Sequence, residues 1–402
     1  MESKLELLSP AGDYEKLLMS VTYGADAVYL AGREFGMRSS AGNFDSDQMK
    51  KVIQFCHLNG VKVYVTCNTL PREHEIDRIP QYLEFLDSVG ADAVIAADIG
   101  VMAAVKKYAP NVKLHMSTQF GVVNSSAAET LYNLGADTVV LARELSLDEI
   151  SIIRSKVSPK LRLEAFVHGA MCVSFSGRCL LSNYLTGRDS NRGECAQPCR
   201  WKYALCEEKR PGEFFSIEEE QGRGTYILNS RDMCMIEHIE ELKNAGISSL
   251  KIEGRMKSSY YAAAVTNAYR HVIDNVENGT VPDPVWYREV NMVSHRPYST
   301  GFYYGYPGQH DSVSSYESDA DVMAIVESCD ADNNAVLVQR NKFKSGEALQ
   351  LLTPDSLPVD FIAGTIYDQE DNVIEDTCHA AMKFKMKLPS RAVPLSIIRK
   401  VK

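Results

Sequence analysis

The segment GADAVYL at residues 24–30 recurs as GADAVIA at 90–96, as GADTVVL at 135–141 and, in a looser copy, as GISSLKI at 246–252. Each copy follows an amphipathic stretch, and its glycine suits the left-handed position just past the end of a helix. The aliphatic run after the glycine is typical of a buried parallel strand. The repeat therefore predicts alternating helices and parallel strands.

The sequence between the copies continues the same alternation. Further strands are predicted at residues 5–8, 61–66, 113–116 and 162–167, and helices at 13–23, 46–58, 73–89, 100–108, 125–134, 146–156, 231–245 and 258–278. Eight strand–helix units over this length match a TIM-like (β/α)8 barrel better than an open sheet. An open doubly wound sheet normally carries a phosphate loop, and neither GxGxxG nor GxxxxGK[ST] occurs in the chain.

The last fifth of the chain has a different pattern. A linker with Gly, Pro and Asp at residues 278–284 ends the barrel pattern, and from residue 321 short alternating runs such as VMAIVESC and AVLVQR are separated by turn signals. These runs predict a small antiparallel β-barrel. We therefore expect an α/β fold with a TIM-like barrel at 1–280, an aromatic linker segment at 281–316 and a C-terminal β-barrel domain at 317–402.

Composition and charge narrow the class of protein. With 402 residues, 45% hydrophobic and 24% charged, the chain is typical of a globular protein, and its net charge of −10 argues against non-specific coating of nucleic acid. The first residues lack the basic and apolar regions of a secretory signal, and no apolar run approaches the roughly 20 residues that span a bilayer. A cytoplasmic protein without a membrane segment is expected.

Four of the ten cysteines, Cys172, Cys179, Cys195 and Cys199, fall within the Gly-rich loop at residues 168–202, and Cys234 follows. In a reducing compartment such a group is more typical of metal binding than of disulfides. The spacing lacks the paired CxxC motifs of structural zinc and fits an iron–sulfur cluster. Zinc, and no metal at all, stay open as alternatives.

Polar residues stand where the predicted barrel strands end, which is where TIM-like barrels carry their chemistry. They are Ser9, Arg33, Asn68, Asp98, Ser117, Gln119, Arg143, Glu144, His168, Asn229, Glu253 and Arg255. Some are expected to be helix caps, since Ser, Asp and Asn are favoured there. As a set, with several arginines beside the cysteines, they predict a pocket for an anionic substrate next to a metal centre.

The C-terminal module carries a run of basic residues. Lys383, Lys385 and Lys387 alternate and so share one strand face, and Arg391, Arg399, Lys400 and Lys402 follow. Such a face could contact an RNA backbone or could protect an edge strand from pairing. The aromatic segment HRPYSTGFYYGY at 295–306 could likewise stack bases or pack on the barrel.

Hydrolytic motifs are absent from the sequence. There is neither a GxSxG nucleophile elbow nor an HExxH zinc helix. Cys172 lies four residues after His168, but this spacing in an irregular loop implies no hydrogen bond, and the neighbouring cysteines favour ligation. The residues themselves give proteolysis weak support.

Four stretches closely resemble the collagenase-like family, catalogued as peptidase family 32 of the unassigned class. They are ELLSPAGDYEKLLMSVTYGADAVYLAG at 6–32, the block at 164–201, SLKIEGRMKSSYYAA at 249–263 and HRPYSTGFYYG at 295–305. The resemblance covers essentially the whole chain, and it looks closest to the branch that hydroxylates the tRNA wobble uridine to 5-hydroxyuridine with prephenate. Related branches hydroxylate an rRNA cytidine or ubiquinone precursors.

This resemblance implies an iron–sulfur RNA hydroxylase with tRNA as partner and a paralogous chain as a further possible partner. Cys172, Cys179 and Cys195 match the ligand motif of the family, which implies a 4Fe–4S cluster, and the fourth ligand is either Cys199 or Cys234. The implied substrate-binding residues, suited to the dicarboxylate prephenate, are Arg33, Gln119, Arg143 and Arg255. The implied catalytic residues are Asn68, Glu164, His168 and Glu253. A collagenase-like peptidase, an rRNA cytidine hydroxylase and a non-enzymatic tRNA-binding protein are the alternatives.

Overall fold

The computed structural model describes residues 4–37, 42–201, 203, 205–206, 212, 214–215, 230–308 and 316–402. Eight parallel strands form a closed barrel because the last of them, β11, pairs with both β1 and β7. In chain order they are β1 (Glu6–Pro10), β2 (Ala27–Leu30), β3 (Lys62–Cys67), β4 (Ala93–Ala96), β5 (Lys113–Met116), β6 (Thr138–Val140), β7 (Arg162–Ala170) and β11 (Ser249–Ile252). The predicted TIM-like barrel is confirmed. Asn229, which the sequence predicted at a strand end, lies outside the described residues.

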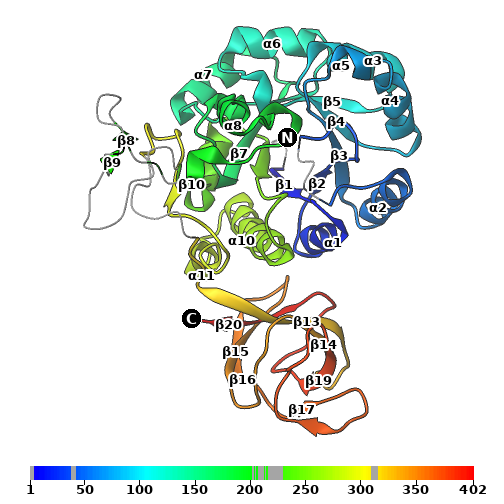
Figure 1. The fold of residues 1–402 in the computed structure, drawn as a ribbon, viewed down its shortest axis with the longest axis vertical. Helices are drawn as coiled ribbons and strands as arrows, with labels where there is room; N and C mark the ends of the chain where they lie inside the picture. Colours follow the sequence, from blue (N-terminus) through cyan, green and yellow to red (C-terminus); the bar gives the residue numbers. More distant parts are fainter. Residues whose placement is uncertain are drawn as a thin grey trace.

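Helices surround this barrel (Figure 1). They are α1 (Tyr14–Thr22), α2 (Ser46–Leu58), α3 (Glu73–Ile76), α4 (Ile79–Ser88), α5 (Ile99–Tyr108), α6 (Ser125–Asn133), α7 (Leu147–Lys156), α9 (Ile239–Asn244) and α10 (Ser259–Glu277). The four repeat glycines, Gly24, Gly90, Gly135 and Gly246, all have positive φ, as the repeat predicted. Each glycine lies just past the end of a helix, in a left-handed backbone conformation that a residue with a side chain would adopt only with strain.

The acidic residue of the repeat joins neighbouring strands. The carboxylate of Asp26 accepts the backbone N–H of Leu7 at 2.8 Å, and that of Asp92 accepts the N–H of Val63 at 2.8 Å. In the looser copy Ser248 stands at this position, and its hydroxyl donates to the carbonyl of Leu163. The repeat thus caps the start of each preceding strand.

Two predicted helices were wrong in extent. Residues 73–89 divide into α3 and α4, because Pro80 lacks a backbone N–H and fits only the first turn of α4. Residues 231–245 begin with a strand, β10 (Asp232–Cys234), and only α9 is helical after a single 3-10 turn. Pairing decides this, since β10 runs antiparallel to the end of β7 and parallel to β12 (Tyr298–Ser299).

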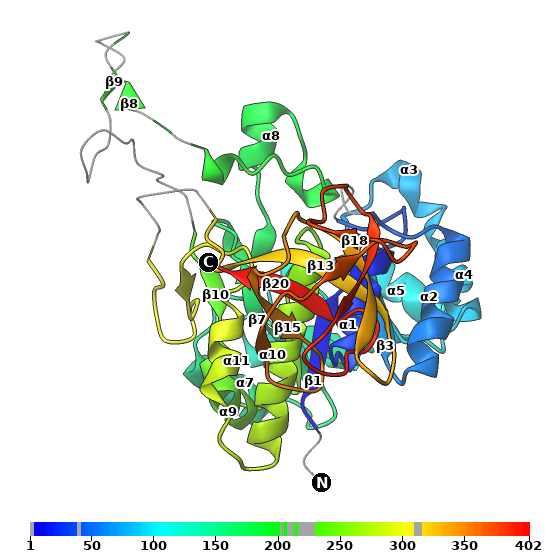
Figure 2. The same cartoon turned by 90° about the horizontal axis from the view of Figure 1, so that it is seen from below.

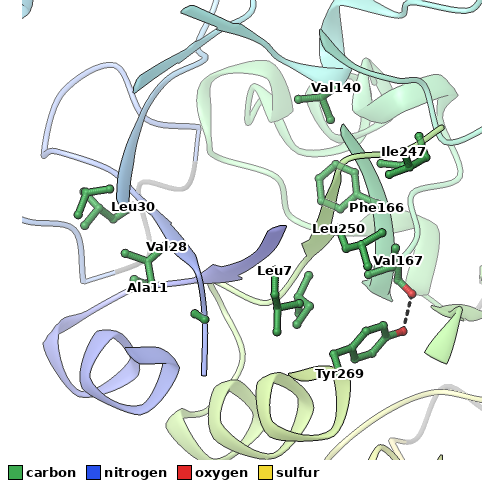
Figure 3. Close-up of a cluster of buried hydrophobic side chains, with 14 of the residues drawn as sticks. Leu7, Ala11, Val28, Leu30, Val140, Phe166, Val167, Ile247, Leu250 and Tyr269 are labelled. Atoms are coloured by element: carbon green, nitrogen blue, oxygen red, sulfur yellow. Dashed lines mark hydrogen bonds between the residues drawn. The ribbon is translucent and has the colours of Figure 1, made fainter. Parts of the chain in front are cut away.

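The core fills the space between the strands and the helices. Leu7, Val28 and Leu250 from the strands face this layer (Figure 3), and each is fully buried. The hydroxyl of Tyr269 on α10 donates to the carbonyl of Val167 at 2.8 Å, so the long helix is tied to the strand that leads into the cysteine loop.

The cysteine loop leaves the barrel after β7, as predicted. It contains α8 (Leu181–Thr186) and the 3-10 turns η2 (Phe175–Gly177), η3 (Ser190–Arg192) and η4 (Pro198–Arg200), and a short ribbon of β8 (Leu205–Cys206) and β9 (Phe214–Phe215) follows. Figure 2 shows α8 projecting beyond the barrel, at the end away from the N-terminus.

The C-terminal strands form an antiparallel half-barrel, in agreement with the predicted β-module. They are β13 (Ala320–Cys329), β14 (Asn334–Gln339), β15 (Ala348–Leu352), β16 (Val359–Ile362), β17 (Ile366–Tyr367), β18 (Val373–Ile374), β19 (Lys383–Lys387) and β20 (Ile397–Val401). This sheet lies beyond α1, α10 and α11 (Pro284–Glu289) in Figure 1. The hydroxyl of Tyr23 donates to carbonyls of Leu352 and Leu395, which joins α1 to the sheet.

In the part of the chain that the structure describes, no helix is both long enough and apolar enough to cross a bilayer.

Candidate functional site

A cavity of about 640 Å³ opens at the carboxyl ends of the barrel strands. Its floor lies inside the barrel, where Tyr29, Thr66, Ile95, Phe166 and Lys251 line it. Its mouth is lined by the cysteine loop, with Cys172, Cys179, Cys195 and Cys199 among the lining residues. The strand-end residues and the cysteine loop therefore share one site.

A buried ion pair forms part of the floor. Lys251 Nζ lies 2.7 Å from Glu164 Oε1, and both side chains are almost completely buried. The ammonium also lies over the rings of Tyr29 and Phe166, at 4.8 and 5.4 Å from their centroids. Lys251 lines the cavity whereas Glu164 does not, so Glu164 acts on the site by holding Lys251.

Two amides form one wall. Asn68 Nδ2 donates to Gln119 Oε1 at 3.0 Å, and Asn68 Oδ1 accepts the backbone N–H of Met37 at 3.2 Å. Because both side chains are fixed by hydrogen bonds, their remaining polar atoms present a defined pattern to the cavity. Asp98 and Ser117 cap the starts of α5 and η1, as the capping alternative predicted, and Ser117 lines the cavity as well.

Two arginines bring positive charge to the cavity. Arg143 Nη1 donates to the carbonyl of Ala170 at 3.0 Å, and its guanidinium lies 3.8 Å from the ring centroid of Phe166. Arg255 donates to Thr66 Oγ1 at 3.3 Å and to Asn43 Oδ1 at 2.6 Å. Both of these contacts are to neutral oxygens, and Arg255 lines the cavity.

The mouth carries two further cations. Arg200 Nη1 donates to the hydroxyl of Tyr316 at 2.6 Å, and Lys257 Nζ lies 4.2 Å from the Tyr316 ring centroid. Burial lowers the pKa of Lys257 to about 8. Among the described residues, the charged lining of the cavity consists of the cations Arg143, Arg200, Lys251, Arg255 and Lys257 and the carboxylate Glu253. Cations therefore outnumber carboxylates in this part of the lining.

The four cysteines of the mouth form one electrostatic group. Burial raises the pKa of Cys172 and of Cys199, and neighbouring thiols raise both further. No three His, Cys, Asp or Glu side chains within the described ranges lie close enough together to hold a metal ion as they stand. Four thiols on one loop nevertheless match the ligand set of an iron–sulfur cluster, so the donor chemistry fits that group.

Cys234 lies apart from this group. It stands on β10 opposite His168 of β7, and its sulfur is 4.0 Å from the hydroxyl of Tyr269. Burial raises its pKa to about 11. It does not line the cavity, and the two candidates for a fourth ligand therefore occupy different surroundings.

The sequence-predicted residues separate into two sets. The cavity brings together Asn68, Gln119, Arg143, Glu253 and Arg255 with the four loop cysteines. Arg33, Glu164 and His168 are not among its lining residues. Arg33 is exposed and pairs with Asp45 at 3.2 Å. His168 is buried between Tyr269 and Tyr298, and burial lowers its pKa to about 3.

Comparison with known proteins agrees with this architecture. The profile described as "Peptidase family U32" matches residues 12–312, and that of the "Peptidase family U32 C-terminal domain" matches residues 318–399. The chain belongs to peptidase family U32.

Its U32 relatives carry different names. "tRNA hydroxylation protein P1" of Bacillus subtilis is 37% identical over 99% of this chain and 95% of that protein. "23S rRNA 5-hydroxycytidine C2501 synthase" of Escherichia coli is 36% identical over 68% of this chain and 40% of that protein. "Collagenase" of Porphyromonas gingivalis is 33% identical over 75% of this chain and 73% of that protein.

Sequence reasoning missed Lys251, Lys257 and Arg200 in this U32 site. Lys251 had a usable signal, because a lysine in the middle of the buried strand SLKI needs a partner or a ligand. Lys257 and Arg200 lie in irregular segments where an exposed basic residue is the ordinary expectation. Arg200 reaches the mouth through the fold of the cysteine loop, and Lys257 reaches it through the segment between β11 and α10.

Proposed function

We propose that this chain is a tRNA-modifying enzyme that hydroxylates the wobble uridine to 5-hydroxyuridine, with an iron–sulfur cluster and with prephenate as co-substrate. The observation that carries the proposal is that four loop thiols and five cations line one cavity. The Bacillus subtilis relative, similar over nearly the whole chain, bears the name of a tRNA hydroxylation protein. A tRNA substrate would also make the chain cytoplasmic.

Cys172, Cys179 and Cys195 would hold the cluster, and Cys199 is our choice for the fourth ligand because it lines the same cavity. A bound cluster would supply one-electron transfer next to the substrate. Cys234 is the alternative ligand, but it would have to leave its position beside Tyr269.

The cations would bind the co-substrate. Prephenate carries two carboxylates, and the cavity-lining Arg143 and Arg255 follow β6 and β11, which are separated by one strand, β7, around the barrel. Lys251, held on Glu164 at the floor, would add a further charged donor. Charge-assisted hydrogen bonds from these groups would fix the orientation of the dianion.

The base would meet the polar wall. The amides of Asn68 and Gln119 can donate to and accept from the edge of uracil. Glu253, a carboxylate of the lining, would accept a proton at Oε2, which receives a long hydrogen bond of 3.4 Å from Tyr29. In these roles Asn68, Gln119 and Glu253 would contact the substrates directly.

Metal analysis of anaerobically purified protein tests the cluster. Wild type should contain about four irons and four sulfides per chain and a broad visible absorption. Cys199→Ser should lose the cluster, and Cys234→Ser should keep it. The reverse result moves the fourth ligand to Cys234, while iron-free protein that still hydroxylates tRNA contradicts the cluster proposal.

Nucleoside mass spectrometry tests the reaction. Isolated chain incubated with unmodified tRNA and prephenate should add one oxygen to the wobble uridine, and omission of prephenate should abolish the gain. Modification of an rRNA cytidine instead would favour the activity named in the Escherichia coli relative. Activity only in the presence of a second family member would reveal a paralogous partner.

A peptidase is the weaker candidate. The name of the Porphyromonas gingivalis relative motivates it. The obvious nucleophile–base pair would be Cys172 with His168, but the His168 ring nitrogens lie 3.4 Å from the hydroxyls of Tyr269 and Tyr298, away from the cavity lining.

A further inference from the structure

Most basic residues of the C-terminal half-barrel are engaged within the protein. Ion pairs of 2.5 to 3.1 Å hold Lys383 on Glu327, Lys385 on Asp371, Lys400 on Glu347 and Lys402 on Asp321. Arg399 is fully buried against Glu289. Strand β19 pairs with both β14 and β17, so its lysines do not protect an edge. This face offers little net charge to an RNA backbone.

The mouth of the cavity has the opposite character. Aromatic side chains are exposed around it, among them Tyr184 on α8 at 81% and Phe175 in η2 at 53%. Arg178 and Arg188 are exposed beside them, and neither forms an ion pair with another described residue. Residues 172–201 contain four arginines and two acidic residues, a local net charge of +2 in a chain of −10.

The loop that carries this surface is braced to the barrel. Arg192 makes two hydrogen bonds to the carboxylate of Glu75, at 2.7 and 2.8 Å. Ser182 on α8 accepts the backbone N–H of Ala196 at 3.0 Å. Because these contacts fix α8, the exposure of Tyr184 belongs to a defined surface that projects from the barrel end (Figure 2).

Tyr316 connects the surface to the cavity. Its ring is held between Arg200 and Lys257, and all three residues line the cavity mouth. Trp201, partly exposed, follows Arg200 directly. A chain crossing the mouth would therefore meet aromatic rings and guanidinium groups before its reactive part entered the barrel.

We propose that this mouth surface, rather than the C-terminal half-barrel, binds the single-stranded loop of the RNA substrate. Tyr184 and Trp201 stack on bases next to the target, and Arg178 and Arg188 contact phosphates. A base reaches the floor of a barrel cavity only when it is unpaired, so a loop is the RNA form that fits. The inference rests on the proposed RNA-modifying function and adds the binding surface to it.

Fluorescence anisotropy with a labelled, unmodified tRNA tests the surface. Tyr184→Ala should weaken binding at least about fivefold, since one base–aromatic stack is lost. The double variant Arg178→Ala/Arg188→Ala should lower the slope of log K against log salt by about 2. The matched control, Lys383→Ala/Lys385→Ala, removes two lysines of β19 and should change binding by less than about twofold. Unchanged iron content in every variant shows that the loop is folded.

The other outcomes are distinguishable. Loss of binding in the β19 control with full binding in the loop variants would overturn the surface and leave the proposed function standing. Wild type that binds no RNA, but whose self-association or association with a paralogous chain is lost in Tyr184→Ala, would assign the surface to a protein. That result would overturn the RNA-binding surface. Hydroxylation of tRNA by the two chains together would then keep the proposed function, and its absence would overturn that proposal as well.

Discussion

Lys251 balances the buried negative charge of Glu164 at the cavity floor. Its pairing with Glu164 leaves a buried carboxylate behind if the lysine is removed. We expect Lys251→Met to cost about 3–5 kcal/mol of unfolding free energy, because an unpaired buried charge is strongly destabilising. It should also raise KM for the proposed co-substrate, prephenate, about tenfold or more, through loss of one charge-assisted contact. Urea unfolding and initial rates measure the two effects.

The double variant Lys251→Met/Glu164→Gln separates them. Stability should largely return, because no uncompensated charge remains, while KM stays high. Recovery of KM together with stability would mean that Lys251 serves only the fold.

His115 makes stability depend on pH. It is buried beside Tyr64 with no hydrogen-bond partner among the described residues, and burial lowers its pKa from 6.5 to about 3. The unfolded chain therefore binds a proton below pH 6.5 that the folded chain does not, so stability is complete above pH 6.5 and falls as the pH drops toward 3. His115→Leu should make the slope shallower by about 1.4 kcal/mol per pH unit between pH 6 and 5.

Urea midpoints across this pH range measure the slope. His379→Leu is the control, since that side chain is exposed and folding does not bury it. An unchanged slope in His115→Leu would mean that His115 takes up its proton in the folded protein.

At the scale of elements, the hydrophobic repeat predicted the barrel because each strand–helix unit carries its own local signal. Strand β10 had no such local signal, because its pairing with β7 and β12 joins residues far apart in sequence. This pairing also explains why His168 is buried. β7 runs three residues beyond its predicted end, and β10 covers the extension. A residue predicted at the rim is therefore internal.

An ion pair holds β10 in place. Arg296 Nη2 and Nε lie 2.6 and 3.0 Å from Asp232 Oδ1, and both side chains are buried. Arg296→Met should cost about 3–5 kcal/mol, because Asp232 keeps its charge without its main partner. Arg296→Met/Asp232→Asn should cost clearly less, and urea unfolding compares them. Equal losses in both variants would show that packing, and not charge, fixes the strand.

For the whole molecule, the sequence predicted two sheet-bearing parts but not how they join. The helix–strand repeat and the alternating C-terminal runs are local patterns, whereas the contact between the parts depends on single residues with no pattern. Arg399 is an example of such a residue, because nothing in the sequence separates it from the other basic residues near the C-terminal end of the sequence. In the fold it crosses to Glu289 of α11, at 2.6 and 2.8 Å, and both are buried.

This ion pair should make the two parts unfold together. Arg399 also donates to the hydroxyl of Tyr260 at 3.0 Å, so it joins β20 to both α10 and α11. Arg399→Met leaves Glu289 unpaired and should cost about 3–5 kcal/mol at the contact. The half-barrel should then separate and unfold at lower urea than the barrel, in place of one cooperative transition.

Trp286 provides the probe for this separation. It lies on α11 and stacks on His271 of α10, with ring centroids 3.9 Å apart. In wild type its fluorescence and the far-ultraviolet circular dichroism should change at one urea concentration. In Arg399→Met the two signals should diverge, and Arg399→Met/Glu289→Gln should bring them back together. Coincident transitions in Arg399→Met would mean that the apolar contact of Ile325, Leu352 and Ile397 with the barrel core suffices to couple the parts.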